Sequence, residues 1–173
     1  MEVSVQATDS LKIKGKTASV FFNPIDKTSQ YNAAILLGSP AKSSLKIKDD
    51  IVVIDGPGEY EAGGIKITGT SVGEKTVFTL SVDGVEVLVG DRDALESAHQ
   101  KLKEHHVLIV RAESVGTAGF ASALGTNATV FFGAHANEVS DTLNKDSKKT
   151  VSKYSIVAGK FPAEVETIVL SSS

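Results

Sequence analysis

The sequence predicts a mixed α/β domain in which two β-sheets pack together with helices on the outside. Hairpins dominate the first half of the chain, and strands alternate with helices in the second half. The clearest hairpin joins residues 77–82 to 85–89 through Asp83-Gly84, a pair typical of a type I′ turn. A length of 173 residues suits one domain, and we expect it to span residues 1–173.

The N-terminal elements are short and strand-like. Residues 3–5 predict a strand, and residues 11–14 and 17–22 predict a hairpin across Gly15-Lys16. The continuous apolar run 33–37 is typical of a strand that is covered on both faces. Residues 41–50 are rich in lysine and serine, so we expect them to be exposed.

The central stretch runs from Ile51 to Asp91. Its first strand, 51–54, stops at Asp55-Gly56-Pro57-Gly58, where proline and two glycines predict a sharp turn. Residues 65–68 then alternate strictly between apolar and polar. The stretch ends at Gly90-Asp91, where helix-forming sequence begins, so Asp91 is expected at the end of a core strand.

The second half alternates between the two kinds of element. The predicted helices are 94–103, 116–124 and 136–143, and the predicted strands are 107–110, 129–132, 151–157 and 165–170.

Composition excludes several classes of function. A net charge of −3 gives no basic field for a nucleic-acid backbone, and the absence of cysteine excludes thiolate chemistry. Arg92 and Arg111 are the only arginines, which argues against an arginine-lined carboxylate or phosphate site. The sequence shows neither a membrane span nor a signal peptide, so we expect a cytoplasmic protein with no membrane partner.

Several of these segments together resemble the metallo-β-lactamase superfamily, in particular a compact bacterial branch similar to ascorbate-6-phosphate lactonase and other predicted zinc-dependent hydrolases. The resemblance is carried by residues 55–61, the Asn23-Pro24 turn, the Asp83-Gly84 hairpin, Gly90-Asp91 and the tail 153–170. It implies a four-layer αββα sandwich with a metal site at the mouth between the two sheets.

The chain departs from this family where the metal ligands are expected. The family's His-x-His-x-Asp-His motif follows the strand matching residues 33–37, and residues 38–43 here read Gly-Ser-Pro-Ala-Lys-Ser. A further family histidine is replaced within Gly73-Glu74-Lys75, and the last one falls on Ala134, next to His135. Ala7-Thr8 replaces an early Gly-His pair, and Asn23 replaces a turn aspartate.

Of the implied ligands, Asp91 alone matches cleanly. One carboxylate does not hold Zn²⁺, since a hydrolytic site needs about three protein ligands. Lys42 would place an ammonium where the family holds its dication. The sequence therefore predicts that the metal site is lost and that no cofactor is bound.

Two residues are weak catalytic candidates. Asp91 could be a remaining ligand or general base, or it could cap the following helix by accepting hydrogen bonds from amides near Asp93 and Ala94. His135 could return to a ligand position if the loop shifts by one residue, or it could be an exposed loop histidine.

Other polar clusters have a structural alternative as well. Asp55, Glu59 and Glu74 are weak candidates for a binding cleft, but the stretch 55–61 is also explained as a turn. His99, His105 and His106, with Glu104, could bind a metal, although a solvated helix end explains them better. Gly116–Gly119 could bind a small anion or could serve close packing. The Ser-x-x-Lys matches at 39–42 and 43–46 lack their partner motifs and are attributed to chance.

Three functional hypotheses follow. The first is a non-catalytic protein that acts through binding or assembly, with another copy or a catalytic relative as its partner. The second is a metal-dependent hydrolase of phosphoesters or lactones, in which Asp91 and His135, together with Glu74 or Asp141, would bind Zn²⁺ in a rearranged site. The third is a small-molecule binder that uses the old cleft without chemistry.

Overall fold

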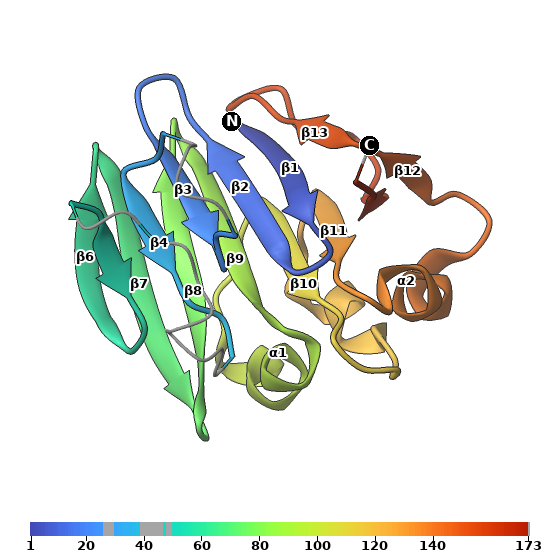
Figure 1. Cartoon of the computed structure of the whole chain (residues 1–173). Helices are drawn as coiled ribbons and strands as arrows, with labels where there is room; N and C mark the ends of the chain where they lie inside the picture. The colour runs from blue at the N-terminus through green and yellow to red at the C-terminus, as the bar shows by residue number, and fades with distance from the viewer. Residues whose placement is uncertain (26–29, 39–46, 48–49, 173) are drawn as a thin grey trace.

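The computed structural model describes residues 1–25, 30–38, 47 and 50–172, and these form two stacked β-sheets (Figure 1). The six-stranded sheet has the order β13-β1-β2-β3-β4-β5, and the eight-stranded sheet has the order β12-β14-β11-β10-β9-β8-β7-β6. The mixed α/β class predicted from the sequence is therefore confirmed.

The strands of the six-stranded sheet are β1 (Glu2–Ala7), β2 (Ser10–Lys14), β3 (Ser19–Phe22), β4 (Ala33–Ile35), β5 (Val52–Ile54) and β13 (Lys153–Ser155). Those of the eight-stranded sheet are β6 (Gly58–Ala62), β7 (Ile65–Val72), β8 (Lys75–Val82), β9 (Val85–Asp91), β10 (Val107–Arg111), β11 (Ala128–Phe132), β12 (Lys149–Val151) and β14 (Glu166–Leu170). The helical segments are α1 (Arg92–Ala98), the 3-10 helices η2 (His99–Lys101) and η3 (Gly119–Leu124), and α2 (Ala136–Asn144).

The main core lies between the two sheets. Strand alternation turns one face of each strand inward, so that Val3, Ile13 and Val20 meet residues of the other sheet such as Phe78 and Ile109. The central strand β10 is buried along its whole length, as expected for a parallel strand with both faces covered.

A second core lies on the outer face of the eight-stranded sheet. There α1, η3 and α2 place Leu95, Phe120 and Val139 against Leu108 and Phe131. The outer face of the six-stranded sheet carries a smaller cluster of Phe21, Tyr31 and Ala34 with Ile47 and Ile51. In the part of the chain that the structure describes, α1, η3 and α2 thus pack on the eight-stranded sheet, and η2 lies against α1 and η3.

Most predicted elements appear in place. The Asp83-Gly84 turn is confirmed, and both residues have positive φ, 52° and 80°, as a type I′ turn requires. The helix predicted at 94–103 is shorter, because α1 ends at Ala98 and η2 follows. The helix predicted at 116–124 begins only at Gly119 and is a 3-10 helix.

The strand predicted at 151–157 was wrong. β12 pairs with β14 in one sheet and β13 pairs with β1 in the other, so the chain crosses between the sheets at Ser152. The hydrophobic pattern of Val151, Tyr154 and Ile156 does not reveal this crossing, because all three side chains pack towards the same inter-sheet core.

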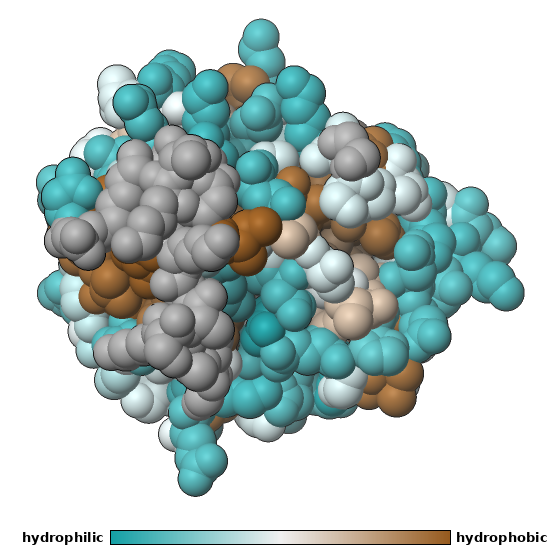
Figure 2. All heavy atoms as spheres, in the orientation of Figure 1, coloured by the Kyte–Doolittle hydropathy of each residue, from teal (hydrophilic) through white to brown (hydrophobic). Residues whose placement is uncertain are grey.

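None of the helices found in the described residues is long and apolar enough to cross a bilayer. On the face shown in Figure 2, most visible side chains are hydrophilic and the hydrophobic ones form separate clusters.

Candidate functional site: a carboxylate held by two cations

Asp91 and Arg111 lie side by side at the ends of two neighbouring strands. They are register partners in the parallel pair β9 and β10, and parallel strands bring their carboxyl ends to one edge of the sheet. Only 4% of the Asp91 side chain and 7% of the Arg111 side chain are exposed. A carboxylate that is buried so completely must be compensated by positive charge or hydrogen bonds.

Two cations supply this compensation from opposite sides. Arg111 donates from Nη1 to Asp91 Oδ1 at 3.2 Å, within the buried part of the site. The Nζ of Lys75 lies 3.1 Å from the other oxygen, Oδ2. Lys75 is the first residue of β8, so a strand antiparallel to β9 delivers the second cation.

Three further carboxylates surround this central trio. Lys75 donates to both oxygens of Asp93, at 2.9 and 3.0 Å. Arg111 pairs through Nη2 with Glu113, and its Nε lies 3.5 Å from Asp9 Oδ1. Two cations thus face four carboxylates, which gives the cluster a formal charge of +2 − 4 = −2.

The pKa shifts follow from burial and from this charge distribution. Burial lowers the pKa of Lys75, but the hydrogen bonds to Asp93 and Asp91 and the charges of these residues outweigh it, so the net shift is upwards. Burial raises the pKa of Asp93, and Lys75 reverses this into a net lowering. The pKa of Glu113 is raised by burial, with Arg111 opposing and Asp91 and Asp9 adding to the rise. Lys75 therefore stays protonated at neutral pH.

Gly38 brings the loop after β4 onto this cluster. Its φ is +73°, and a Cβ atom built there would lie 3.1 Å from Arg111 Nη1 and 3.7 Å from Asp91 Oδ2. Gly38 is also the first residue of the stretch in which the resemblance places the family's histidine motif. The Arg111 guanidinium therefore lies against the start of that stretch.

Asn23 fixes this loop from the other side. Its Oδ1 accepts a hydrogen bond from the Leu37 amide at 2.9 Å, and its Nδ2 donates to the Asp9 carbonyl oxygen at 3.3 Å. An aspartate could not donate the second bond. The change from a turn aspartate to Asn23 thus has a structural use, because the amide joins β4 to the turn that carries Asp9.

The donor set around Asp91 does not fit a divalent metal. Metal ligands are neutral imidazoles, thiolates or carboxylates, whereas the two oxygens of Asp91 face an ammonium and a guanidinium. Among residues 1–25, 30–38, 47 and 50–172, no group of three or more His, Asp or Glu side chains is placed to hold an ion.

The capping role considered for Asp91 was wrong. Asp91 occupies the N-cap position of α1, but its side chain makes no capping hydrogen bond. Its carboxylate pairs with Lys75 and Arg111 instead. The amide of Ala94 is bound by Asp93 Oδ1 at 3.0 Å.

His135 lies at the start of α2, with its side chain about one-third exposed. Its Nδ1 lies 3.0 Å from Glu138 Oε2, and its backbone amide donates to the Ala112 carbonyl oxygen at 3.0 Å. These contacts position His135 at the helix start and do not join it to Asp91.

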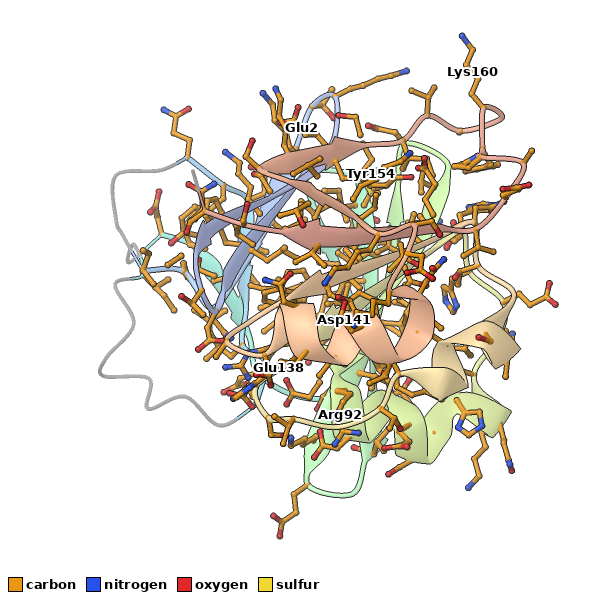
Figure 3. The ribbon with its side chains drawn as sticks, turned by 90° about the vertical axis from the view of Figure 1, so that its right-hand side faces the viewer. Glu2, Arg92, Glu138, Asp141, Tyr154 and Lys160 are labelled. Carbon is orange, nitrogen blue, oxygen red and sulfur yellow. The ribbon has the colours of Figure 1, made fainter. Side chains whose placement is uncertain are left out.

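The remaining candidate carboxylates lie on the surface. Asp55, Glu59 and Glu74 are exposed, on the turn after β5, on β6 and on the turn before β8. Asp141 lies on α2 (Figure 3) and pairs with Lys148 at 2.6 Å. The structure does not bring these four residues together with Asp91 into a group that could hold an ion.

The turn after β5 has a structural explanation. The Tyr60 hydroxyl lies 3.2 Å from the Gly56 carbonyl oxygen and 3.1 Å from that of Pro57. The turn also packs against Gly69 of β7, where a Cβ atom would lie only 2.7 Å from the Gly56 oxygen. Backbone packing therefore accounts for the glycine and proline pattern.

The histidines near α1 have separate local partners. His106 Nδ1 accepts a hydrogen bond from the Glu86 amide at 2.9 Å, and its ring stacks on Phe161. His99 Nδ1 lies 2.5 Å from the Glu96 carbonyl oxygen, and His105 Nδ1 lies 2.7 Å from that of Lys103. His106 is thus not part of a solvated helix end, since it links the β9 hairpin to the C-terminal segment.

Gly116 also serves packing. A Cβ atom there would lie 2.5 Å from the Arg92 guanidinium carbon, so a larger residue would require the Arg92 side chain to move. The amide of Ala118 is already bound by the Thr142 hydroxyl at 2.8 Å.

Sequence reasoning missed Lys75, Arg111, Asp9 and Glu113. The scarcity of arginine argued only against an arginine-lined ligand site, and it gave no signal that Arg111 would pair with a carboxylate of the chain itself. The cation that was expected in the site, Lys42, and both Ser-x-x-Lys matches, at 39–42 and 43–46, lie outside the described residues. Arg111 could have been found by noting that a charged residue ends the apolar run 107–110.

The sequence matches no protein-family model and none of the curated proteins. Solved structures do match. A structure from Thermotoga maritima, assigned to the Zn-dependent hydrolases of the metallo-β-lactamase superfamily, superposes with a TM-score of 0.73 and 18% identity over 98% of both chains. The chain has the metallo-β-lactamase fold. A structure assigned as a metal-dependent hydrolase from Parabacteroides distasonis aligns with a TM-score of 0.58 and 12% identity, over 99% of this chain and 93% of that one.

Both alignments cover almost the whole chain, so the shared fold includes both sheets. At these identities the comparison establishes the fold alone. What the site does must be argued from Asp91 and its neighbours.

Proposed function

We propose that this protein is a non-catalytic member of the metallo-β-lactamase fold that acts through binding or assembly. The observation that carries the proposal is the placement of Lys75 and Arg111, at 3.1 and 3.2 Å, on the two oxygens of Asp91. In this arrangement the two cationic side chains take the place of a bound ion.

Electrostatics support this reading. Two unit charges 4 Å apart interact by about 4 kcal/mol at the effective dielectric constant of a protein surface, and a dication doubles that repulsion for each neighbouring cation. An ion beside Asp91 would therefore have to displace Lys75 and Arg111. The carboxylates that could attract it are already paired with these two side chains.

The partner that we propose is a second copy of the chain or a catalytic relative in a mixed oligomer. A chain that keeps both sheets and their turns, and that pairs the remaining carboxylate of the site with its own cations, is suited to presenting a surface.

Metal analysis of the purified protein tests the proposal. We expect zinc, iron and manganese far below one equivalent per chain after exposure to each metal and desalting. Tightly bound metal near one equivalent, lost in Asp91→Asn and kept in Asp93→Asn, would overturn the proposal. Asp93→Asn is the matched control because it removes a neighbouring carboxylate that is mostly exposed.

A parallel activity test addresses the hydrolase alternative. We expect no metal-dependent turnover of phosphoester or lactone substrates. A metal-dependent rate that Asp91→Asn abolishes and Asp93→Asn preserves would establish the hydrolase in place of the non-catalytic protein.

A further inference from the structure

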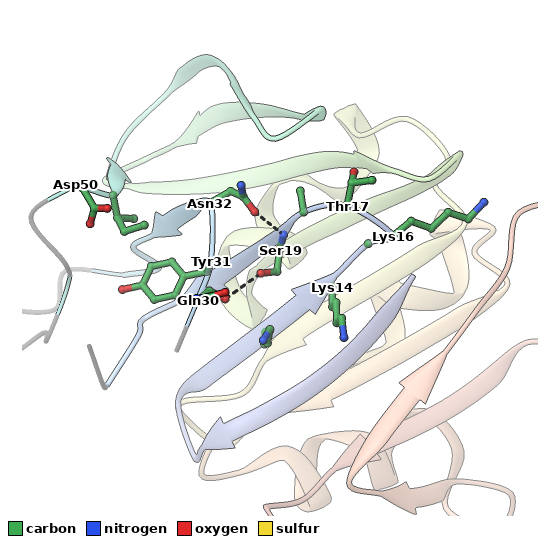
Figure 4. Close-up of a pocket in the computed structure, with 12 residues that line it drawn as sticks. Lys14, Lys16, Thr17, Ser19, Gln30, Tyr31, Asn32 and Asp50 are labelled. Atoms are coloured by element: carbon green, nitrogen blue, oxygen red, sulfur yellow. Dashed lines mark hydrogen bonds between the residues drawn. The ribbon is translucent and has the colours of Figure 1, made fainter. Parts of the chain in front are cut away.

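A hollow of about 630 Å³ opens beside the β2–β3 hairpin, on the opposite side of the six-stranded sheet from its main core. Figure 4 shows Tyr31 at one end of it and Lys16 at the other, with Ser19 and Asn32 between them. The volume falls within the range that small-molecule sites occupy.

The hollow is lined by three lysines at alternate positions. Lys12 and Lys14 belong to β2 and share a strand face, and Lys16 follows in the turn. Neighbouring ammonium groups repel one another, and an anion placed between them would relieve this repulsion.

These three ammonium groups form no ion pair within the described part of the chain. Lys12 lies over the Phe21 ring, 5.3 Å from its centroid, while Lys14 and Lys16 are exposed. Glu2 is the register partner of Lys14, but its carboxylate lies 3.4 Å from Lys153. Among the lining residues that the structure describes, Asp50 is the one carboxylate, so these residues carry a formal charge of +3 − 1 = +2.

Hydrogen bonds hold several of the other lining residues in position. The Ser19 amide donates to Asn32 Oδ1 at 2.9 Å, and the Ser19 hydroxyl donates to the Gln30 carbonyl oxygen at 3.3 Å. These bonds hold residues 30–32 over β3, and the Tyr31 ring packs on Phe21 with centroids 4.8 Å apart. One wall of the hollow is therefore already built without a ligand.

We propose that this hollow is a binding site for small phosphorylated molecules. Lysine ammonium groups act as mobile point charges that suit phosphate, whereas the bidentate geometry of arginine is not present here. The phosphate would lie by Lys14 and Lys16, and Asp50 at the far end would accept hydrogen bonds from hydroxyl groups of the ligand. The site is separate from Asp91, so its proposal and that of the non-catalytic function can fail independently.

Titration calorimetry with pyrophosphate and with glucose 6-phosphate, at low ionic strength, tests the site. We expect saturable binding of at least one of them to the wild type, and we expect the double variant Lys14→Gln/Lys16→Gln to bind about tenfold more weakly, as the loss of about 1.4 kcal/mol of charge attraction would give. The matched control is Lys101→Gln/Lys103→Gln, which removes two exposed lysines elsewhere and should change the affinity by less than about twofold.

The outcomes separate the possible causes. Absence of binding to the wild type, or an equal loss in both double variants, would overturn the proposal, because the second result indicates attraction by net charge alone. Sulfate at equal ionic strength distinguishes recognition of phosphate from general screening, since it should compete only weakly. Thermal unfolding of both double variants should match the wild type, as expected for exposed side chains.

Discussion

Arg111 is the partner on which Asp91 depends most, because its guanidinium is as buried as the carboxylate that it holds. Lys75 is about one-third exposed, so water can replace it in part. Removal of one member of a buried pair leaves an uncompensated charge, which costs more than the pair itself contributes.

This difference gives a prediction for two variants. We expect Arg111→Met to lower the free energy of unfolding at pH 7 by about 3 kcal/mol, because Asp91 stays buried with less compensation. Lys75→Met should cost about 1 kcal/mol or less, as expected for a pair that water screens. Urea denaturation measures both.

A double-mutant cycle provides the control. Asp91→Asn/Arg111→Met removes both charges and should lose less than the sum of its single variants. Additive losses, or a loss below about 0.5 kcal/mol in Arg111→Met, would contradict the view that these charges compensate each other.

At the scale of single residues, the sequence located Asp91 but not its partners. The strand pattern and the helix start fix where Asp91 falls. Lys75 lies on another strand, and its contact depends on how β8 lies against β9 and on the direction of a long, flexible side chain. Local pattern carries neither kind of information.

At the scale of elements, the turn after β5 is held by backbone contacts across the sheet. Gly56 and Pro57 lie against Gly69 of β7, and Tyr60 binds two carbonyl oxygens of the turn. The turn is thus built from residues of three segments, although its sequence reads as a local motif.

Gly69→Ala and Gly56→Ala should therefore differ. A Cβ at Gly69 would overlap the Gly56 oxygen, whereas nothing lies within 4 Å of a Cβ at Gly56. We expect Gly69→Ala to lower the free energy of unfolding by about 1 to 3 kcal/mol and Gly56→Ala to change it by about 0.5 kcal/mol at most. Equal values from chemical denaturation would show that the turn can move away without cost.

Element types followed from the sequence wherever the pattern was local. The Asp83-Gly84 hairpin needs only its turn residues and the alternation around it. The split between β12 and β13 depends on which sheet has an edge free to accept each short strand, and β1 and β14 provide those edges from distant parts of the chain.

At the scale of the whole molecule, the protection of backbone amides against hydrogen exchange should fall from the middle of the eight-stranded sheet to its edges. β10 lies between two strands and under two cores, whereas β6 is an edge strand with mostly exposed side chains. Central and edge strands open locally with different free energies, and amide hydrogen exchange measures these free energies.

We expect the amides of β9, β10 and β11 to exchange slowest, close to the global unfolding limit, and those of β6 to exchange much faster. Hydrogen–deuterium exchange with mass spectrometry measures this by peptide. Equal protection of β6 and β10 would contradict the prediction and would indicate that another chain covers the edge.

The sandwich as a whole could be predicted because hairpins in the first half and alternating strands and helices in the second leave few ways to bury two apolar faces. The resemblance also implied the stacking of two sheets with helices outside, and in the described part of the chain α1, η3 and α2 all cover the eight-stranded sheet. The charge cluster could not be predicted, because it forms where β9 and β10 end and β8 begins, and these strand ends come together only in the folded sheet.

The pairing of Asp91 with Arg111 across neighbouring strands has a consequence for biogenesis. Folding of a metalloprotein is coupled to the capture of its ion, so its yield follows the supply of that ion in the cell. Here the positive charge that compensates Asp91 belongs to Arg111, which is synthesised as part of the next strand. We expect newly made chains to reach their native state at the same rate in cells starved of metal ions and in cells supplied with them.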